Sequence, residues 1–75
     1  MSRVIRYFDK VDESYIDEVL LDVPLAWLQE LFGVDADNPM YDCYPIEKAQ
    51  EAFFKTYSKI NFNFYRFEYF LEYDA

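Results

Sequence analysis

The residues whose side chains are best suited to binding or catalysis lie between positions 35 and 47, in the stretch DADNPMYDCYPIE. This stretch holds the only cysteine of the chain, two of the three prolines, two tyrosines and four acidic residues, and it contains no lysine or arginine. Carboxylates attract cationic partners, and tyrosine and methionine are enriched at the centres of protein interfaces. The stretch therefore predicts a binding loop for a positively charged protein.

The sequence gives little indication of a catalytic site in this stretch. The chain has no histidine to activate Cys43, and a single glycine excludes a glycine-rich phosphate loop. Asp35 and Asp37 suggest a calcium loop, but positions six and twelve of that pattern hold Met40 and Ile46 where glycine and glutamate are needed. We therefore expect no enzyme activity, no metal site and no cofactor.

The prolines make the loop suitable for binding. Pro39 and Pro45 each restrict the residue before them, so the loop should be fixed at both ends and should lose little entropy when a partner binds. The expected contact set is Asp35, Asp37, Tyr41, Asp42 and Tyr44. A second candidate patch lies earlier in the chain and consists of Asp12, Glu13, Asp17 and Glu18.

Several of these residues also have a purely structural interpretation. Cys43 and Trp27 are expected to be buried, and Met40 is expected to fill a gap in the core. Tyr41 and Tyr44 can each either contact a partner or fold back onto the core. The acids can equally form a solvated face that keeps a small protein soluble.

The N-terminal half predicts a hairpin followed by a helix. Residues 3–9 and 15–23 are rich in β-branched and aromatic residues and predict two strands. The helix should begin near Pro24 with Asp22 as its N-cap, and it should end at Gly33, the only glycine.

The C-terminal half predicts a second helix and a long strand. The helix is expected from Pro45 to Lys59, and the strand over residues 61–74. One face of this strand should meet the helices, whereas the other mixes charge with Phe62, Phe64 and Phe70. The order ββααβ predicts one α+β domain over residues 1–75, with a three-stranded, mostly antiparallel sheet, its first strand central, and both helices on one face.

Charge limits the partners. The net charge is −8, and the interval between Lys10 and Lys48 carries ten acids and no lysine or arginine. Direct binding to nucleic acid or to anionic membranes is not expected, because both carry the same sign. A lone cysteine, no apolar run of membrane-spanning length and no apolar signal region at the N-terminus predict a cytoplasmic protein.

Three segments carry a family resemblance: IRYFDK (5–10), LQELFGV (28–34) and above all NPMYDCYP (38–45). With these, most of the chain resembles the short acidic bacterial immunity proteins of polymorphic toxin systems, including contact-dependent growth inhibition. The resemblance implies a protein that binds and neutralises a cognate toxin. A nuclease toxin has a basic cleft for phosphates, which an acidic protein could block.

Two alternatives remain open. An acidic small protein can mimic nucleic acid and block several unrelated nucleic-acid-binding proteins. Ten acids between Lys10 and Lys48 are sparse for a phosphate mimic, however. The chain can also be a small self-associating module that forms a homodimer through the last strand. Binding to one partner, to many, or only to itself distinguishes the three functions.

Overall fold

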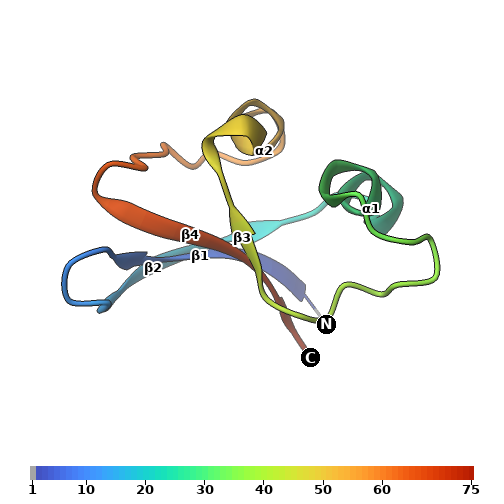
Figure 1. Ribbon diagram of the computed structural model, residues 1–75, viewed down its shortest axis with the longest axis horizontal. Coiled ribbons are helices and arrows are strands. Elements are labelled where there is room, and N and C mark those ends of the chain that lie inside the picture. The colour runs from blue at the N-terminus through green and yellow to red at the C-terminus, as the bar shows by residue number, and fades with distance from the viewer. Residues whose placement is uncertain (1) are drawn as a thin grey trace.

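The protein is built on one antiparallel sheet of four strands, with the order β2-β1-β4-β3. In the computed structural model, which describes residues 2–75, these strands are β1 (Ser2–Asp9), β2 (Tyr15–Leu21), β3 (Tyr44–Ile46) and β4 (Phe67–Asp74). Two helices, α1 (Leu25–Phe32) and α2 (Glu51–Tyr57), lie on the same side of the sheet (Figure 1). The α+β class and the placement of both helices on one face are thus confirmed.

The predicted hairpin forms, and β1 is an inner strand as expected. The turn between β1 and β2 is held by Asp9, whose backbone N–H donates to the carbonyl of Ser14 at 2.9 Å and whose side chain accepts from the N–H of Val11 at 2.8 Å. Val19 and Leu21 face the core, whereas Leu20, between them, is 71% exposed. The second strand ends at Leu21, two residues earlier than predicted.

The prediction of three strands is wrong, because Tyr44, Pro45 and Ile46 pair with β4 as a fourth strand. Proline has no N–H to donate, and it is tolerated here because β3 lies at the edge of the sheet. The second helix therefore does not begin at Pro45. A 3-10 turn, η1 (Lys48–Gln50), comes first, and a capping box between Glu47 and Gln50 starts it.

The first helix confirms one predicted boundary and corrects the other. Gly33 ends α1 in the left-handed conformation with φ 66°, which glycine adopts without steric cost. The N-cap is Pro24 and no side chain caps the helix, so the predicted role of Asp22 is wrong. No helix within residues 2–75 is long and apolar enough to cross a membrane.

The last strand begins at Phe67 instead of residue 61, because the backbone N–H groups of Arg66 and Phe67 both donate to the carbonyl of Asn63 in a turn. Phe62 and Phe64 precede the strand and stack on each other with ring centroids 5.0 Å apart. Both pack edge-on against Tyr69 in the core, so they share no face with Phe70.

These placements change the basis for the predicted homodimer. β4 is an inner strand, paired with β1 along its length and with β3 over Tyr69–Leu71. Self-association through the last strand stays a prediction, but it would have to use the open face of the strand and not its paired edges.

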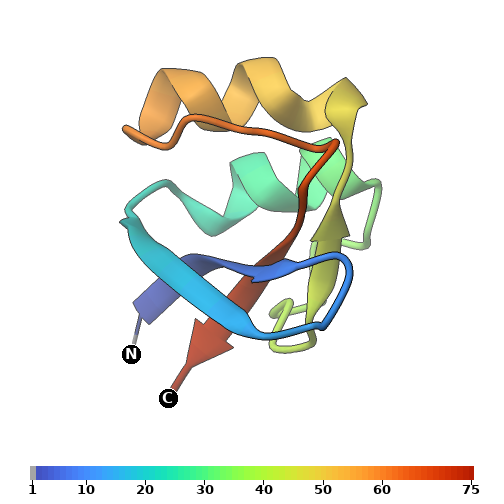
Figure 2. The ribbon, with the colours of Figure 1, turned by 90° about the vertical axis from the view of Figure 1, so that its left-hand side faces the viewer.

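The core lies between the sheet and the helix layer, which Figure 2 shows from the side. Both helices send fully buried side chains into it, Leu28 from α1 and Phe54 from α2, and the inner strands contribute Ile5 and Leu71. Met40, from the loop that follows α1, is also 1% exposed and fills this core, as predicted. The loop is thereby attached to the core by one of its own residues.

Candidate partner-binding surface

The loop between α1 and β3, residues 33–43, is held in place by a buried side chain of α1. Gln29 is 7% exposed, and its amide nitrogen donates to the carbonyls of Ala36 at 3.0 Å and Asn38 at 2.8 Å. A buried amide that satisfies two loop carbonyls fixes the path of the backbone over these residues. The backbone N–H of Asn38 also donates to the carbonyl of Asp35 at 3.0 Å, closing a turn.

The second half of the loop is held by β1. The guanidinium of Arg3 donates to the carbonyls of Met40 and Pro39, each at 2.7 Å, and it lies over the ring of Tyr73 at 5.1 Å. Met40 has the uncommon left-handed backbone, with φ 55°, and its N–H donates to the side chain of Asn38 at 2.8 Å. Bonds on both sides of Met40 stabilise this conformation.

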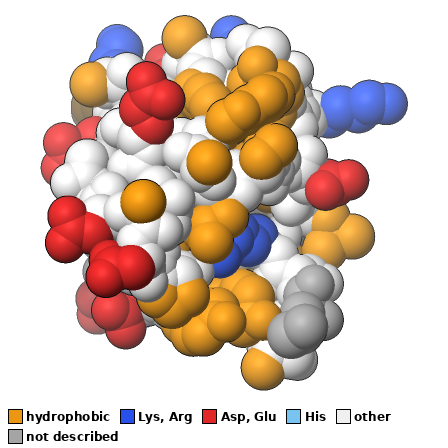
Figure 3. Space-filling view, turned by 90° about the vertical axis from the view of Figure 1, so that its right-hand side faces the viewer, with side chains coloured by type: hydrophobic (Ala, Val, Ile, Leu, Met, Phe, Trp, Pro, Cys, Tyr) orange, Lys and Arg blue, Asp and Glu red, His pale blue; other side chains and the backbone are white. Residues whose placement is uncertain are grey.

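The loop therefore presents its acids from a rigid frame. Asp35, Asp37 and Asp42 are exposed, and Tyr41 is 61% exposed while its ring lies 4.4 Å from that of Tyr73. The face that carries α1 and the loop has acidic side chains along one side and hydrophobic side chains at the level of the helices (Figure 3). Four of the five predicted loop contacts are thus accessible to a partner.

Tyr44 has a structural position. It is half-buried at the start of β3, where its ring packs against Phe32 with centroids 5.4 Å apart and its hydroxyl accepts from the amide of Asn38 at 3.5 Å. Of the two alternatives for this residue, the structure favours packing. Its role is to support the loop from the sheet side.

The predicted patch on the hairpin is separate from the loop. Asp12 and Glu13 lie in the β1–β2 turn, at the other end of the long axis of the molecule (Figure 1). Asp12 accepts from both the N–H and the hydroxyl of Ser14, and these bonds hold its pKa below the ordinary value. Asp17 and Glu18 follow on β2, where Asp17 accepts from the N–H of Glu18. The two predicted patches do not form one surface.

An ion-pair cluster that the sequence does not reveal covers the open face of the sheet. Arg6, on the inner strand β1, pairs with Glu18 at 2.8 Å, Glu72 at 2.6 Å and Asp74 at 2.9 Å. The bond to Glu18 is the largest of the effects that raise the pKa of Arg6, and the same bond lowers the pKa of Glu18. Because its charge is offset, Glu18 is a weaker candidate for partner binding than the loop acids.

Cys43 is exposed, in contrast to the buried position expected for it. Its thiol donates to a carboxylate oxygen of Glu72 at 3.5 Å. Partial burial and the negative charge of Glu72 raise the pKa of this thiol. A raised pKa keeps the sulfur protonated and poorly nucleophilic, which does not suit a catalytic cysteine.

Trp27 also differs from its expected place. It lies on α1 next to the buried Leu28 but is 45% exposed, because the buried face of the helix is centred on Leu28 and Gln29 and Trp27 lies about 100° around the helix from Leu28. With Phe53 and Tyr57 of α2 it lines an open groove between the helices, of about 320 Å³. This groove therefore lies in the helix layer.

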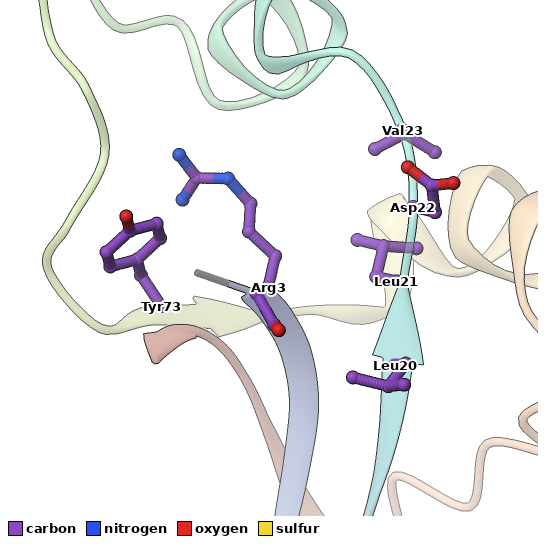
Figure 4. Close-up of a pocket in the computed structure, with 7 residues that line it drawn as sticks. Arg3, Leu20, Leu21, Asp22, Val23 and Tyr73 are labelled. Carbon is purple, nitrogen blue, oxygen red and sulfur yellow. The ribbon is translucent and has the colours of Figure 1, made fainter. Parts of the chain in front are cut away.

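A hollow at the end of the sheet is a weaker candidate for a binding site than the loop or the groove. It has a volume of about 390 Å³, with Arg3 and Tyr73 on one side and residues 20–23 on the other (Figure 4). Both terminal nitrogens of Arg3 already donate to loop carbonyls. Within residues 2–75, no group of three or more histidine, cysteine or acidic side chains is arranged to hold a metal ion.

Comparison with known proteins places the chain in a family. No curated protein matches it. A family model described as a domain of unknown function, DUF7683, matches residues 2–72, which is nearly the whole chain and includes the helices, the loop and all of the sheet except the last two residues of β4. The chain therefore belongs to the DUF7683 family.

Proposed function

We propose that this chain is a bacterial immunity protein, acting in the cytoplasm, that binds and neutralises a toxin domain with a basic, phosphate-binding surface, as a nuclease has. The observation that carries the proposal is the loop, in which exposed acids stand on a backbone fixed by Gln29 and Arg3. A surface that is fixed before binding loses little conformational entropy when the complex forms.

The charge of the whole chain supports the same kind of partner. With a net charge of −8, the protein attracts a basic surface over a distance and repels nucleic acid and anionic lipid. Opposite charges can raise association to about 10⁸ M⁻¹s⁻¹ or more at low salt, compared with about 10⁵–10⁶ M⁻¹s⁻¹ without steering. Rapid capture is what a cell needs against a toxin that acts on its own nucleic acid.

The resemblance of the segments at 5–10, 28–34 and 38–45 to immunity proteins of polymorphic toxin systems supports the biological setting. In the structure the first segment lies in β1 and the turn after it, the second includes Gln29 of α1, which holds the loop, and the third forms the second half of the loop and the start of β3. The most specific of the three segments thus carries Tyr41 and Asp42 of the expected contact set and directly follows Asp37.

The test begins with capture of the partner. The tagged chain is expressed in its native bacterium together with the neighbouring gene, the bound protein is purified, and its cleavage of RNA or DNA is titrated with the chain. We expect one basic nuclease domain, loss of cleavage at one molecule of inhibitor per nuclease, and nanomolar affinity. Recovery of no protein whose activity is inhibited would refute the function.

Charge variants then test the loop. Asp37→Lys/Asp42→Lys should slow association with the nuclease about ten-fold or more at low salt, because it reverses the local field. Asp22→Lys/Glu68→Lys is the matched control: both acids are exposed, form no side-chain hydrogen bond or ion pair within residues 2–75, and give the same change in net charge. Equal rates for the two variants would show that the loop is not the contact surface.

The capture experiment also distinguishes the immunity function from the two alternatives. Capture of several unrelated basic nucleic-acid-binding proteins would replace the immunity function by nucleic-acid mimicry. Recovery of the chain alone, with sedimentation that depends on concentration, would indicate a self-associating module.

A further inference from the structure

The groove between α1 and α2 has the composition of a site for a cation. It is lined by three aromatic residues, one carboxylate and one aliphatic residue: Trp27, Phe53, Tyr57, Glu30 and Leu31. The rings of Trp27 and Tyr57 have centroids 5.3 Å apart at 51°, and those of Phe53 and Tyr57 are 4.9 Å apart at 55°. The tilted rings make an open aromatic corner, with Glu30 among the lining residues.

The exposed rings are not needed by the core. Leu28 and Phe54, their neighbours along the two helices, are 0% exposed and already fill the space above the sheet. Trp27 is 45% exposed and Tyr57 43%, so both leave apolar surface in water. Contiguous exposed apolar surface with polar residues at its rim marks interaction sites, whereas single exposed apolar residues do not.

The faces of aromatic rings attract cations, with tryptophan the strongest, and a nearby carboxylate adds to the attraction. Among cations, guanidinium fits best, because it is planar, weakly hydrated and able to stack on a ring while donating to a carboxylate. The chain already uses this contact twice, with Arg3 over Tyr73 at 5.1 Å and Arg66 over Phe67 at 5.5 Å. Within residues 2–75, no arginine or lysine of the chain makes such a contact with Trp27 or Tyr57.

We propose that this groove binds an arginine side chain supplied by the partner protein. The site itself follows from the rings and Glu30, and only the identity of the donor rests on the proposed function, in which the partner is a basic toxin domain. A stable interface covers about 800 Å² on each protein, about a sixth of the 5124 Å² exposed here. A partner that covers both the groove and the loop would gain contact area from each.

Trp27 is the only tryptophan of the chain, so its indole N–H gives a single resonance that reports on the groove. The probe is N-acetyl-arginine amide, titrated at physiological salt, and the comparison is N-acetyl-citrulline amide, which has nearly the same shape and no charge. We expect saturable shifts of the indole resonance with arginine at millimolar concentrations, and binding of citrulline weaker by about ten-fold or more.

Two variants locate the binding and two matched variants control for general effects. Glu30→Gln and Tyr57→Leu should each weaken arginine binding several-fold. Glu68→Gln and Tyr65→Leu, at exposed positions outside the groove, should leave it unchanged. Circular dichroism of each variant shows whether the fold is retained, and the more conservative Glu30→Gln keeps the test valid if Tyr57→Leu unfolds.

The outcomes separate this inference from the proposed function. Equal binding of arginine and citrulline, or arginine binding unchanged in both groove variants, would refute the cation site. Equal binding of N-acetyl-lysine amide would refute the choice of guanidinium. Arginine binding in the groove, together with failure to find an inhibited nuclease, would support the site and reject the donor that the proposed function names.

Discussion

Replacing Arg3 by methionine tests whether the loop is held by β1. The variant keeps an apolar stem near Tyr73 but removes both donors from the carbonyls of Met40 and Pro39, each at 2.7 Å. The bond to Met40 is partly buried, and a hydrogen bond from a charged donor in such a place contributes about 1.5–3 kcal/mol. The bond to Pro39 is exposed and water replaces it, so it contributes less.

We therefore expect Arg3→Met to lower the free energy of unfolding by about 2 kcal/mol. A chain of this length has a total stability of roughly 4–11 kcal/mol, so the loss is large. Since the slope of stability with urea is about 1 kcal/mol per molar for a small protein, the unfolding midpoint should fall by about 2 M. Equilibrium urea unfolding followed by circular dichroism measures this shift.

Arg66→Met is the matched control. Arg66 also lies over a ring, that of Phe67 at 5.5 Å, and its loss changes the net charge equally, but its side chain donates no hydrogen bond within residues 2–75. It should cost only about 0.5 kcal/mol. Hydrogen exchange locates the effect, because protection of the Met40 amide should fall in Arg3→Met more than that of Ile5 in β1. Equal losses in the two variants, or unchanged protection of Met40, would refute the idea of a fixed loop.

Three further predictions concern single residues. Gly33→Ala should destabilise the protein by about 1 kcal/mol in urea unfolding, because φ is 66° although the space around the new methyl group is open. The lowered pKa of Glu18 means that its bond to Arg6 stabilises the fold above the ordinary carboxyl pKa, and that this stabilisation is lost as pH falls through the lowered value. In Arg6→Met, the stability to urea should therefore fall less steeply between about pH 6 and pH 3 than in the wild type. An unchanged pH dependence of stability would contradict the pairing. Cys43 should react with iodoacetamide more slowly than a free thiol, because its pKa is raised. Glu72→Gln should accelerate the reaction, because it removes a negative charge that raises the pKa of the thiol. Alkylation no faster in this variant would show that the charge of Glu72 does not raise the pKa of Cys43.

The features that the sequence predicts correctly depend on local chemistry. Gly33 ends α1 because only glycine adopts its conformation without strain, and a single glycine in the chain leaves no competing position. The hairpin follows from alternation on either side of a polar turn. Exposure of Asp35, Asp37 and Asp42 follows from their charge in a segment with no basic partner nearby.

The features that the sequence misses depend on contacts between distant residues. Tyr44–Ile46 is too short for a periodic pattern, and Pro45 suits a first helical turn as well as an edge strand. The capping box from Glu47 to Gln50 is a local signal that could have placed the helix start correctly. The ion pairs of Arg6 with Glu72 and Asp74 span 66 and 68 positions, so only the register of β1 and β4 brings them together.

The loop and the groove should act on different steps of binding. Charges at the edge of an interface act over a distance on the encounter, so the loop variant Asp37→Lys/Asp42→Lys should mainly lower the association rate, and this effect should shrink as salt is added. A desolvated contact forms only after docking, so Tyr57→Leu and Glu30→Gln should mainly raise the dissociation rate. Surface-binding kinetics with the nuclease at two salt concentrations measure both rates. A loop variant that changes only dissociation would mean that these acids are buried contacts, and a groove variant that changes only association would mean that the aromatic corner is not covered in the complex.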